Sequence, residues 1–293
     1  MKKILIITLM LLSSSAAYCQ LNPMGSIYYQ NLYLSNPAMA GIEKGWELNA
    51  GYKSQWSAID GAPNTQALTA AYGSENSKTG FGLLLFNDKA GVVRATSVKA
   101  TYSYHLPLNT EGNNIDFGIS AGILDEWVNY GDVIGDLSDV SISNFNDRKL
   151  YLDADFGMAY RRKGLTLQGT LPNLKRFFDR DIKRNVVDRS LFIASVSYKF
   201  KNGETGLTSI EPKIGFRGVE NYKNIVDAGV NFIFNDDKLM LSGVFHSTGS
   251  VTFGAGTTYK KQFAILCQYT TNTTDLQTYS NGEAEIAIKY NFR

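Results

Sequence analysis

The pentapeptide Gly118-Ile119-Ser120-Ala121-Gly122 is the stretch whose spacing most directly suggests chemistry. Gly-x-Ser-x-Gly is the spacing of the nucleophile elbow, in which a strained turn between a strand and a helix exposes a serine. Here apolar residues alternate with polar residues or glycine from Ile115 to Ile123. That period of two predicts a strand that continues through Ser120, which is the wrong setting for an elbow.

A hydrolase would also need a base beside Ser120, and His105 is the nearest histidine in the sequence. If the intervening turn centres near Thr110, His105 pairs with Asp116, which is about four residues or ~13 Å from Ser120 at the rise of a strand. That separation exceeds hydrogen-bond reach. We therefore expect no catalytic residues and no enzyme activity.

The chain lacks the residues that a metal site or a cofactor site of ordinary composition would need. The chain has two histidines, His105 and His246, and a single cysteine, Cys267, outside the N-terminal leader. This set is too small for a zinc site of ordinary composition, and no phosphate-binding glycine loop is present. We expect no metal, no cofactor and no intramolecular disulfide.

Residues 1–19 read as a secretory signal peptide. Lys2 and Lys3 precede the apolar run Ile4–Leu12, and small residues lead to a cut ahead of Gln20. The alternative to this cleavage is a lipoprotein signal with a lipidated Cys19, but Tyr18 occupies a position at which such signals usually have a small residue. Removing both lysines leaves 27 basic residues against 27 acidic ones, so charge gives no argument for binding nucleic acid. No later apolar run reaches the ~18 residues of a membrane-spanning helix.

The elements that carry these residues are predicted to be strands throughout. The chain has 27 Gly, 17 Tyr and 16 Phe but only 6 Pro, and alternation with period two dominates. From Val226 to Asn235 an apolar face opposes a polar one, and Leu191–Phe200 and Ala284–Phe292 repeat the pattern. In this pattern Cys267 shares the outward, apolar face of its strand.

Two further features favour a membrane barrel over a soluble sandwich. Aromatic residues recur near predicted strand ends, where they suit the headgroup level of a bilayer. Short turns also alternate with long connections, as outer-membrane barrels do. The aromatic positions include Trp46, Tyr52, Tyr102, Tyr104, Tyr198, Phe200, Tyr290 and Phe292, and the long connections are 54–64, 126–149, 171–188 and 271–282.

We predict an all-β fold: a transmembrane antiparallel up-and-down β-barrel of about fourteen strands over residues 45–293. An even number of strands places both ends of the barrel on the periplasmic side and every long loop outside. Predicted strand starts lie near Gly45, Thr65, Thr79, Val92, Asn114, Lys149, Leu165, Arg189, Ser209, Ile225, Lys238, Ser250, Phe263 and Gly282. Asp153 and Asp155 then face the lumen, where we expect bases such as Arg161, Lys213 and Arg217 to pair with them.

The N-terminal part carries motifs that resemble the PorP/SprF family of outer-membrane barrels associated with type IX secretion in Bacteroidetes. Asn36-Pro37-Ala38-Met39-Ala40-Gly41 forms an Asn-Pro-Ala-x-x-Gly box, followed by Gln55-Trp56 and by Gly61-Ala62-Pro63-Asn64-Thr65. Asn87–Gly91 and Leu171–Leu174 also look like family boxes. The resemblance runs from about residue 20 to 293, and one departure is Lys53, where we expect arginine.

The resemblance implies a non-enzymatic outer-membrane protein that supports export of a large secreted cargo protein. Such cargo carries a C-terminal secretion domain, as gliding adhesins do, and the barrel holds that domain at the cell surface. The implied partners are this cargo, other type IX secretion components and outer-membrane lipid. The alternative is a passive, porin-like solute channel, which would require an open bore where an anchor tolerates a plugged one.

Residues 20–44 are too apolar for a free periplasmic tail, because Tyr28, Tyr29, Leu32 and Tyr33 fall within them. We expect this segment to fold into or under the barrel and to close the lumen as a plug. The alternative is a packed periplasmic lid without any effect on transport.

Two outward loops supply candidate partner-binding residues. Gln55, Trp56 and Pro63 lie in the first, where an exposed tryptophan suits a binding site and equally suits an interfacial anchor. The other candidates are charged and aromatic residues after the seventh strand, which equally suit a solvated loop. They are Lys175, Arg176, Phe177 and Phe178.

Overall fold

The computed structural model describes residues 23–57, 61–75, 78–133, 145–147, 150–175, 190–202, 206–219, 223–271 and 281–292. Its strands are β1 (Gly45–Gln55), β2 (Asn64–Gly73), β3 (Thr79–Ala90), β4 (Val93–Pro107), β5 (Asn114–Val128), β6 (Tyr151–Arg162), β7 (Leu165–Leu171), β8 (Ser190–Tyr198), β9 (Phe200–Lys201), β10 (Leu207–Val219), β11 (Ile225–Phe234), β12 (Leu239–His246), β13 (Val251–Tyr259), β14 (Phe263–Thr270) and β15 (Glu283–Phe292). No helix among these residues is long and apolar enough to cross a membrane.

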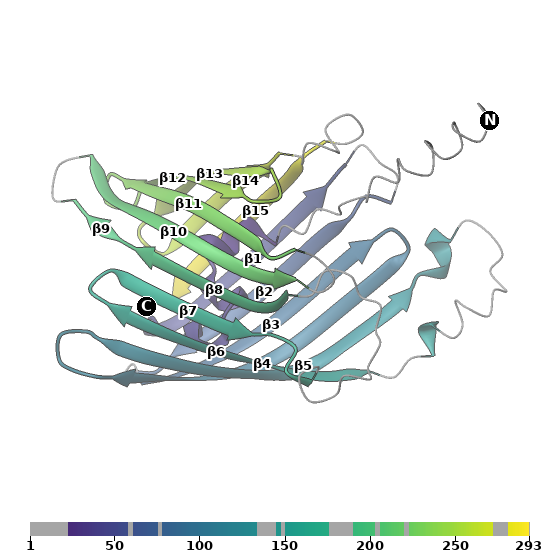
Figure 1. Cartoon of the computed structure of the whole chain (residues 1–293), viewed down its shortest axis with the longest axis horizontal. Helices are drawn as coiled ribbons and strands as arrows, with labels where there is room; N and C mark the ends of the chain where they lie inside the picture. Colours follow the sequence, from purple (N-terminus) through teal and green to yellow (C-terminus); the bar gives the residue numbers. More distant parts are fainter. Residues whose placement is uncertain are drawn as a thin grey trace, which may run out of the picture.

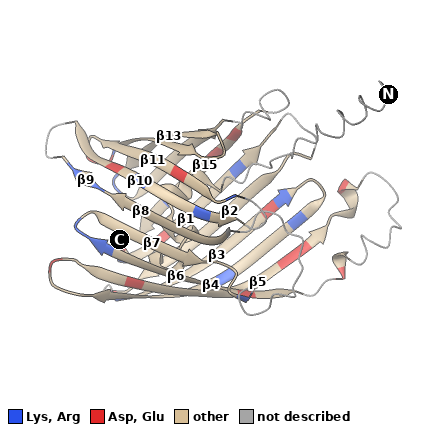
Figure 2. Ribbon diagram, viewed as in Figure 1, with Lys and Arg blue, Asp and Glu red and all other residues tan. Residues whose placement is uncertain are grey.

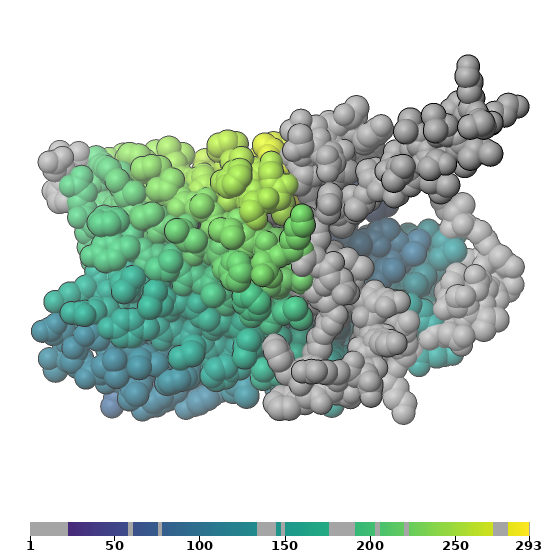
Figure 3. All heavy atoms as spheres, viewed as in Figure 1, coloured from purple at the N-terminus to yellow at the C-terminus, as the bar shows by residue number. Residues whose placement is uncertain are grey.

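The strands form one closed antiparallel barrel (Figure 1). Each strand pairs with its neighbours in the chain, and β1 pairs with β15 from Trp46 opposite Phe292 to Gln55 opposite Glu283. Closure leaves no sheet edge without partners, which is the condition for strands in a bilayer. The space-filling view shows the resulting wall, with consecutive strands following one another around it (Figure 3). The predicted fold class is confirmed.

The barrel has fourteen strands around its wall, and β9 is one additional short strand. Strands β8 and β9 are separated only by Lys199, and both pair with β10. The ladder stops between Lys213, opposite Ser197, and Ile210, opposite Phe200. Pro212 lies in this gap, and because proline has no N–H to donate it interrupts the pairing there.

The two faces of the wall differ as the alternation predicts. Large apolar side chains such as Leu83, Ile214 and Phe253 are more than half exposed on the outer face, where lipid would cover them. Cys267 is exposed on the same face. Figure 2 shows charged residues scattered thinly among neutral ones along the strands. Many of the polar side chains on the strands are instead buried in the lumen, including Asp116, Lys213 and Asp227.

The two ends of the barrel carry connections of different length. At one end, here called the turn end, strands join over short links such as Arg162 to Leu165 and Tyr259 to Phe263. At the other, the loop end, the links from Val128 to Tyr151 and from Leu171 to Ser190 are long. Some loop-end links are short as well: β3 and β4 join across Gly91 and Val92, and β12 and β13 join across residues 247–250.

The N-terminal residues 23–44, here called the lumen segment, pack inside the barrel up to Gly41, and Glu43 and Lys44 at the end of the segment are exposed. They form three single turns of 3₁₀-helix, η1 (Gly25–Tyr28), η2 (Leu32–Leu34) and η3 (Pro37–Met39). The purple turns between the front and back walls in Figure 1 belong to this segment. It begins near Lys53 in the loop-end half and descends to Ser103 and His105 before β1 starts at the turn end.

Candidate functional site

The Asn-Pro-Ala box forms the turn η3 and seats it on the barrel wall. Asn36 caps the turn by accepting a hydrogen bond from the Ala38 N–H at 3.0 Å, and Pro37 occupies the first position, which needs no donor. The Asn36 amide also donates to the carbonyl oxygen of Met158 on β6. The box is therefore a local fold whose cap also binds the wall.

Glycines on the wall allow this close approach. A Cβ added to Gly118 would overlap the backbone of Pro37 and Ala38, and one added to Gly157 would overlap the Asn36 side chain. Within the segment itself, Gly41 at the turn end has φ +66, a backbone conformation that favours glycine, and lies against the Tyr72 carbonyl of the wall. Only glycines at these positions leave room for the lumen segment.

Charged side chains of the wall bind the backbone of the lumen segment. Both carboxylate oxygens of Glu285 accept N–H groups of η1, from Gly25 at 2.6 Å and Ser26 at 3.0 Å. From β10, the Lys213 ammonium donates to the Tyr28 carbonyl at 2.8 Å. These contacts satisfy backbone groups that would otherwise be buried without partners.

The end of the segment is held by Ser103 and by a cluster of three ionisable residues, His105, Asp116 and Arg161. The Ala40 carbonyl lies 2.6 Å from the Ser103 hydroxyl and 3.1 Å from Nε2 of His105. Nδ1 of His105 is 2.8 Å from Asp116, which also accepts Nε and Nη2 of Arg161 at 2.6 and 2.9 Å. The predicted pairing of His105 with Asp116 is confirmed by the strand register.

A second cluster of the same composition lies near the loop end. Asp227 on β11 accepts Nε and Nη2 of Arg217 at 2.6 and 3.0 Å, and lies 2.7 Å from Nδ1 of His246. The other ring nitrogen of His246 faces the Thr252 hydroxyl at 2.8 Å. Each cluster ties three neighbouring strands together across the inner face.

The prediction that bases such as Arg161, Lys213 and Arg217 pair with the lumenal acids Asp153 and Asp155 was wrong. Asp155 pairs with Lys99 of β4 at 2.6 Å. The bases named from sequence are engaged elsewhere, because register places each nearer to another group. Arg161 pairs with Asp116, Arg217 pairs with Asp227, and Lys213 binds the Tyr28 carbonyl.

Apolar side chains complete the packing across the bore. Met24, Ile27 and Tyr28 of the lumen segment form one buried cluster with Ala67 of β2 and Val244 of β12. Further down, Tyr33 packs with Ala71 and Ala40, and its hydroxyl lies 2.7 Å from that of Thr101. Burial raises the pKa of Tyr33 to about 12. Together with the polar anchors, the segment contacts the wall from many directions.

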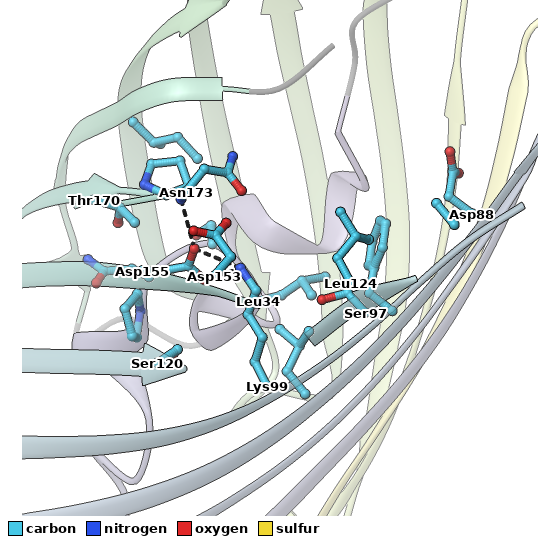
Figure 4. A pocket seen from close by; sticks show the side chains of 18 of the residues that line it. Leu34, Asp88, Ser97, Lys99, Ser120, Leu124, Asp153, Asp155, Thr170 and Asn173 are labelled. Carbon is cyan, nitrogen blue, oxygen red and sulfur yellow. Dashed lines mark hydrogen bonds and ion pairs between the residues drawn. The ribbon is translucent and has the colours of Figure 1, made fainter. Parts of the chain in front are cut away.

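Beside the lumen segment, the loop-end half of the barrel contains a cavity of about 650 Å³, here called the loop-end cavity. Residues 33–37 of the segment line it together with inward-facing residues of β3 to β8. Figure 4 shows Asp153, Asp155 and Lys99 close together, with Leu124 and Ser97 nearby and Asp88 further away. This is the recess in which the barrel can receive a ligand.

The motif serine lies in this lumen and not on an elbow. Ser120 sits within β5, is buried, and lies 2.6 Å from the hydroxyl of Thr101. Both ring nitrogens of His105 have other partners, as described above. Over the described residues, no group of three or more His, Cys, Asp or Glu side chains is placed to hold a metal ion.

The first set of predicted partner-binding residues lies at the loop end of β1 and β2. The Gln55 amide donates to Glu283 at 3.1 Å, and the Gln55 N–H donates to the Pro63 carbonyl at 2.9 Å. Trp56 follows with φ 50, an uncommon conformation for a bulky residue, and its N–H donates to the Gly282 carbonyl. The structure thus brings these three residues together, and their role in partner binding stays a prediction.

The second set is only partly described. Lys175 places its ammonium 4.5 Å from the centre of the Tyr151 ring, a cation–π geometry. Arg176, Phe177 and Phe178 lie outside the described residues. Sequence reasoning missed the backbone anchors Glu285 and Lys213, although their place on the inward face was a usable signal.

Comparisons with known proteins agree with this architecture. The chain is similar in structure to the Acinetobacter baumannii outer membrane protein Omp33, with 9% identity, a TM-score of 0.51 and coverage of 86% of this chain and 100% of that one. A deltaS2S3 mutant of the monoaromatic hydrocarbon channel TodX gives 12% identity, a TM-score of 0.50 and coverage of 90% and 94%. At these identities the likeness shows the fold alone.

No curated protein matches the chain significantly. The family described as type IX secretion system membrane protein PorP/SprF matches residues 19–290, nearly the whole chain and including the box that seats the lumen segment. The chain therefore belongs to the PorP/SprF family of type IX secretion system membrane proteins.

Proposed function

We propose that this protein is a non-enzymatic outer-membrane barrel that supports export of a secreted partner and anchors it at the cell surface. The partner carries a C-terminal secretion domain and resembles a gliding adhesin. Residues 1–19 are removed as a signal peptide, and the loop end faces outward. Type IX secretion components and outer-membrane lipid are the other contacts of the barrel.

The filled lumen is the observation that carries this proposal. The lumen segment contacts Glu285 of β15, Lys213 of β10 and Met158 of β6, which lie on well-separated parts of the wall. A segment tied down from so many directions closes the bore as a plug, leaving a recess at the loop end. A recess closed below suits holding a partner and does not suit passive diffusion.

A passive solute channel remains the alternative function. The name of TodX describes a channel, but at 12% identity that likeness speaks only for the barrel. A channel would require the lumen segment to leave the bore, against all the anchors described above. The channel reading is therefore the less supported of the two.

Affinity purification from outer membranes tests the proposal. The tagged barrel, solubilised in mild detergent, should co-purify with a large secreted protein that carries a C-terminal secretion domain. Deleting the barrel gene should reduce that protein at the cell surface, and re-expressing the barrel should restore it. Absence of any such partner, together with measurable conductance of the purified barrel in planar bilayers, would contradict the proposal and favour the channel.

A further inference from the structure

The loop-end cavity is a recess that the lumen segment closes from below. Its floor includes Leu34 and Pro37 of the segment, and its walls extend to the loop ends of β3, β4 and β5 at Ala90, Val93 and Glu126. The volume of about 650 Å³ lies within the range of known ligand pockets. The recess is therefore large enough for several side chains of a bound polypeptide.

Part of the wall of this cavity is apolar. Leu84 and Phe86 of β3, Leu124 of β5 and Ile193 of β8 line it, with Pro172 beside them. Apolar surface on the inner face of a barrel is exposed to water unless something covers it, at a cost of about 25 cal/mol per Å². A ligand with apolar groups would remove this surface from water.

The charged side chains that line the cavity are unbalanced. Among the described residues that line it, four are acids and one, Lys99, is a base. Lys99 is already held by Asp155, with both carboxylate oxygens within 2.7 Å of its ammonium. The acids are Asp88, Glu126, Asp153 and Asp155.

Asp153 is the acid best placed to receive a cation. Its side chain lies on the inner face, 8% exposed, and accepts the Lys175 N–H at 3.3 Å. Within the described ranges no lysine or arginine forms an ion pair with it. A largely buried carboxylate gains most from a partner that brings both a charge and hydrogen-bond donors.

We propose that the loop-end cavity binds a segment of the secreted partner in which an arginine or lysine is flanked by apolar residues. The cationic side chain pairs with Asp153, and its apolar neighbours cover Leu84, Phe86 and Leu124. This inference rests on the proposed function, since it names the chemistry by which the anchor recognises its partner.

Site-specific photo-cross-linking in living cells tests the proposal. A benzophenone amino acid placed at Leu124 faces the cavity, whereas the same group at Ile123, the neighbour on the exposed outer face, provides the matched control. We expect the partner to be trapped from position 124 and not from 123. Mass spectrometry of the adduct should map the contact to a segment with arginine or lysine beside apolar residues.

The charge is tested by Asp153→Asn in the background that carries the cross-linker at position 124. Loss of a charge-assisted hydrogen bond should lower the yield of the adduct about tenfold. Asp132→Asn is the control, because Asp132 is a loop-end acid outside the cavity lining and should leave the yield unchanged. Heat-modifiable migration of each variant on gels verifies that the barrel has folded.

The possible failures are distinguishable. If the partner co-purifies with the barrel but is not trapped from position 124, the cavity is not its site, while the proposed anchoring function stands. An adduct that maps to an acidic or uncharged segment, or a yield that Asp153→Asn leaves unchanged, also overturns the inference. If no secreted partner co-purifies at all, the proposed function fails and this inference fails with it.

Discussion

Single glycines on the inner face set how close the lumen segment can come to the wall. Gly118 faces the backbone of Pro37 and Ala38, so even one added methyl group has no space. The opposing atoms are backbone and belong to a capped turn, which limits how far they can yield. Such positions couple the fold of the barrel to the seating of the lumen segment.

Gly118→Ala should destabilise the folded barrel by about 1–3 kcal/mol through overpacking. The matched control is Gly243→Ala, because nothing lies within 4 Å of a Cβ added at that position, and its effect should stay within about 0.5 kcal/mol. Urea-dependent unfolding in lipid vesicles, followed by tryptophan fluorescence, measures both. Equal stability of the two variants would show that the segment does not press on this wall.

Asp116 contacts His105 and Arg161 at once, and removing its charge leaves the Arg161 guanidinium without its counter-ion and His105 without its carboxylate partner. Asp116→Asn should cost about 3 kcal/mol in the free energy of unfolding, because the carboxylate is fully buried against His105 and Arg161. The same substitution at the exposed turn residue Asp236 is the control, with an expected change within about 0.5 kcal/mol. A loss no larger at Asp116 than at Asp236 would contradict a bracing role for the cluster.

At the scale of elements, the strands are regular except where a particular residue interrupts them. Pro212 of β10 lacks the N–H that strand pairing would use. The strand that pairs with β10 at this point is therefore interrupted and divides into β8 and β9. At the loop end, the link after β5 forms a short 3₁₀ turn, η4 (Tyr130–Asp132), which Asn129 caps by accepting the Gly131 N–H. Local side chains thus shape the ends of a wall whose pairing is otherwise continuous.

The turn η4 should loosen in acid. Hydrogen bonds from Arg94 above all, and from Asn129 and Lys89, hold the pKa of Asp132 below its ordinary value. A carboxyl with a lowered pKa in the folded state stabilises that state above its unfolded pKa and loses this effect as the pH falls through its folded pKa. The protection factors for hydrogen exchange at residues 129–133, which correct for the intrinsic effect of pH on exchange, should therefore fall only when the pH drops below the ordinary pKa of aspartate.

Asp132→Asn is the control for that measurement. In this variant the protection factors of the same amides should be lower at neutral pH and should no longer change with acidification. If the protection factors of the wild-type protein stayed constant from neutral to strongly acidic pH, the pairing with Arg94 and Lys89 would not hold the turn.

At the scale of the whole molecule, the wall of the barrel is closed and the lumen segment packs across its interior. Strand pairing from β1 to β15 closes the wall, and the lumen segment crosses the bore between Ala67 and Val244. Closure of the wall satisfies backbone groups in lipid, and the lumen segment lines the loop-end cavity. Both features support the anchor function that we propose.

Deleting residues 23–40 should open the lumen. Purified full-length barrel in planar bilayers should show conductance near the background, whereas the deletion variant should show discrete channel steps, because the anchors on Lys213 and Glu285 then hold nothing. Folding of the variant is verified by heat-modifiable migration. A correctly folded deletion variant with conductance as low as that of the full-length protein would contradict the plug.

Much of the architecture was readable from the sequence, because the side-chain period of a strand is two and one face must meet lipid. Strand starts at Gly45, Thr79, Asn114 and Phe263 agree with the structure. The pairing of His105 with Asp116 could be predicted from the position of the one turn that joins their two strands. These predictions depend on neighbours in the chain, and for this reason sequence alone determined them.

The tertiary structure alone decided what lies inside. Glu285 binds Gly25 and Ser26 across almost the whole chain, whereas Asp155 pairs with Lys99 and Asp153 lines the loop-end cavity. Inner-face partners are set by strand tilt, by register around the barrel and by the path of the lumen segment. None of these features is encoded by residues that are neighbours in the sequence. The recess that we propose as the binding site could therefore be recognised only in the closed barrel.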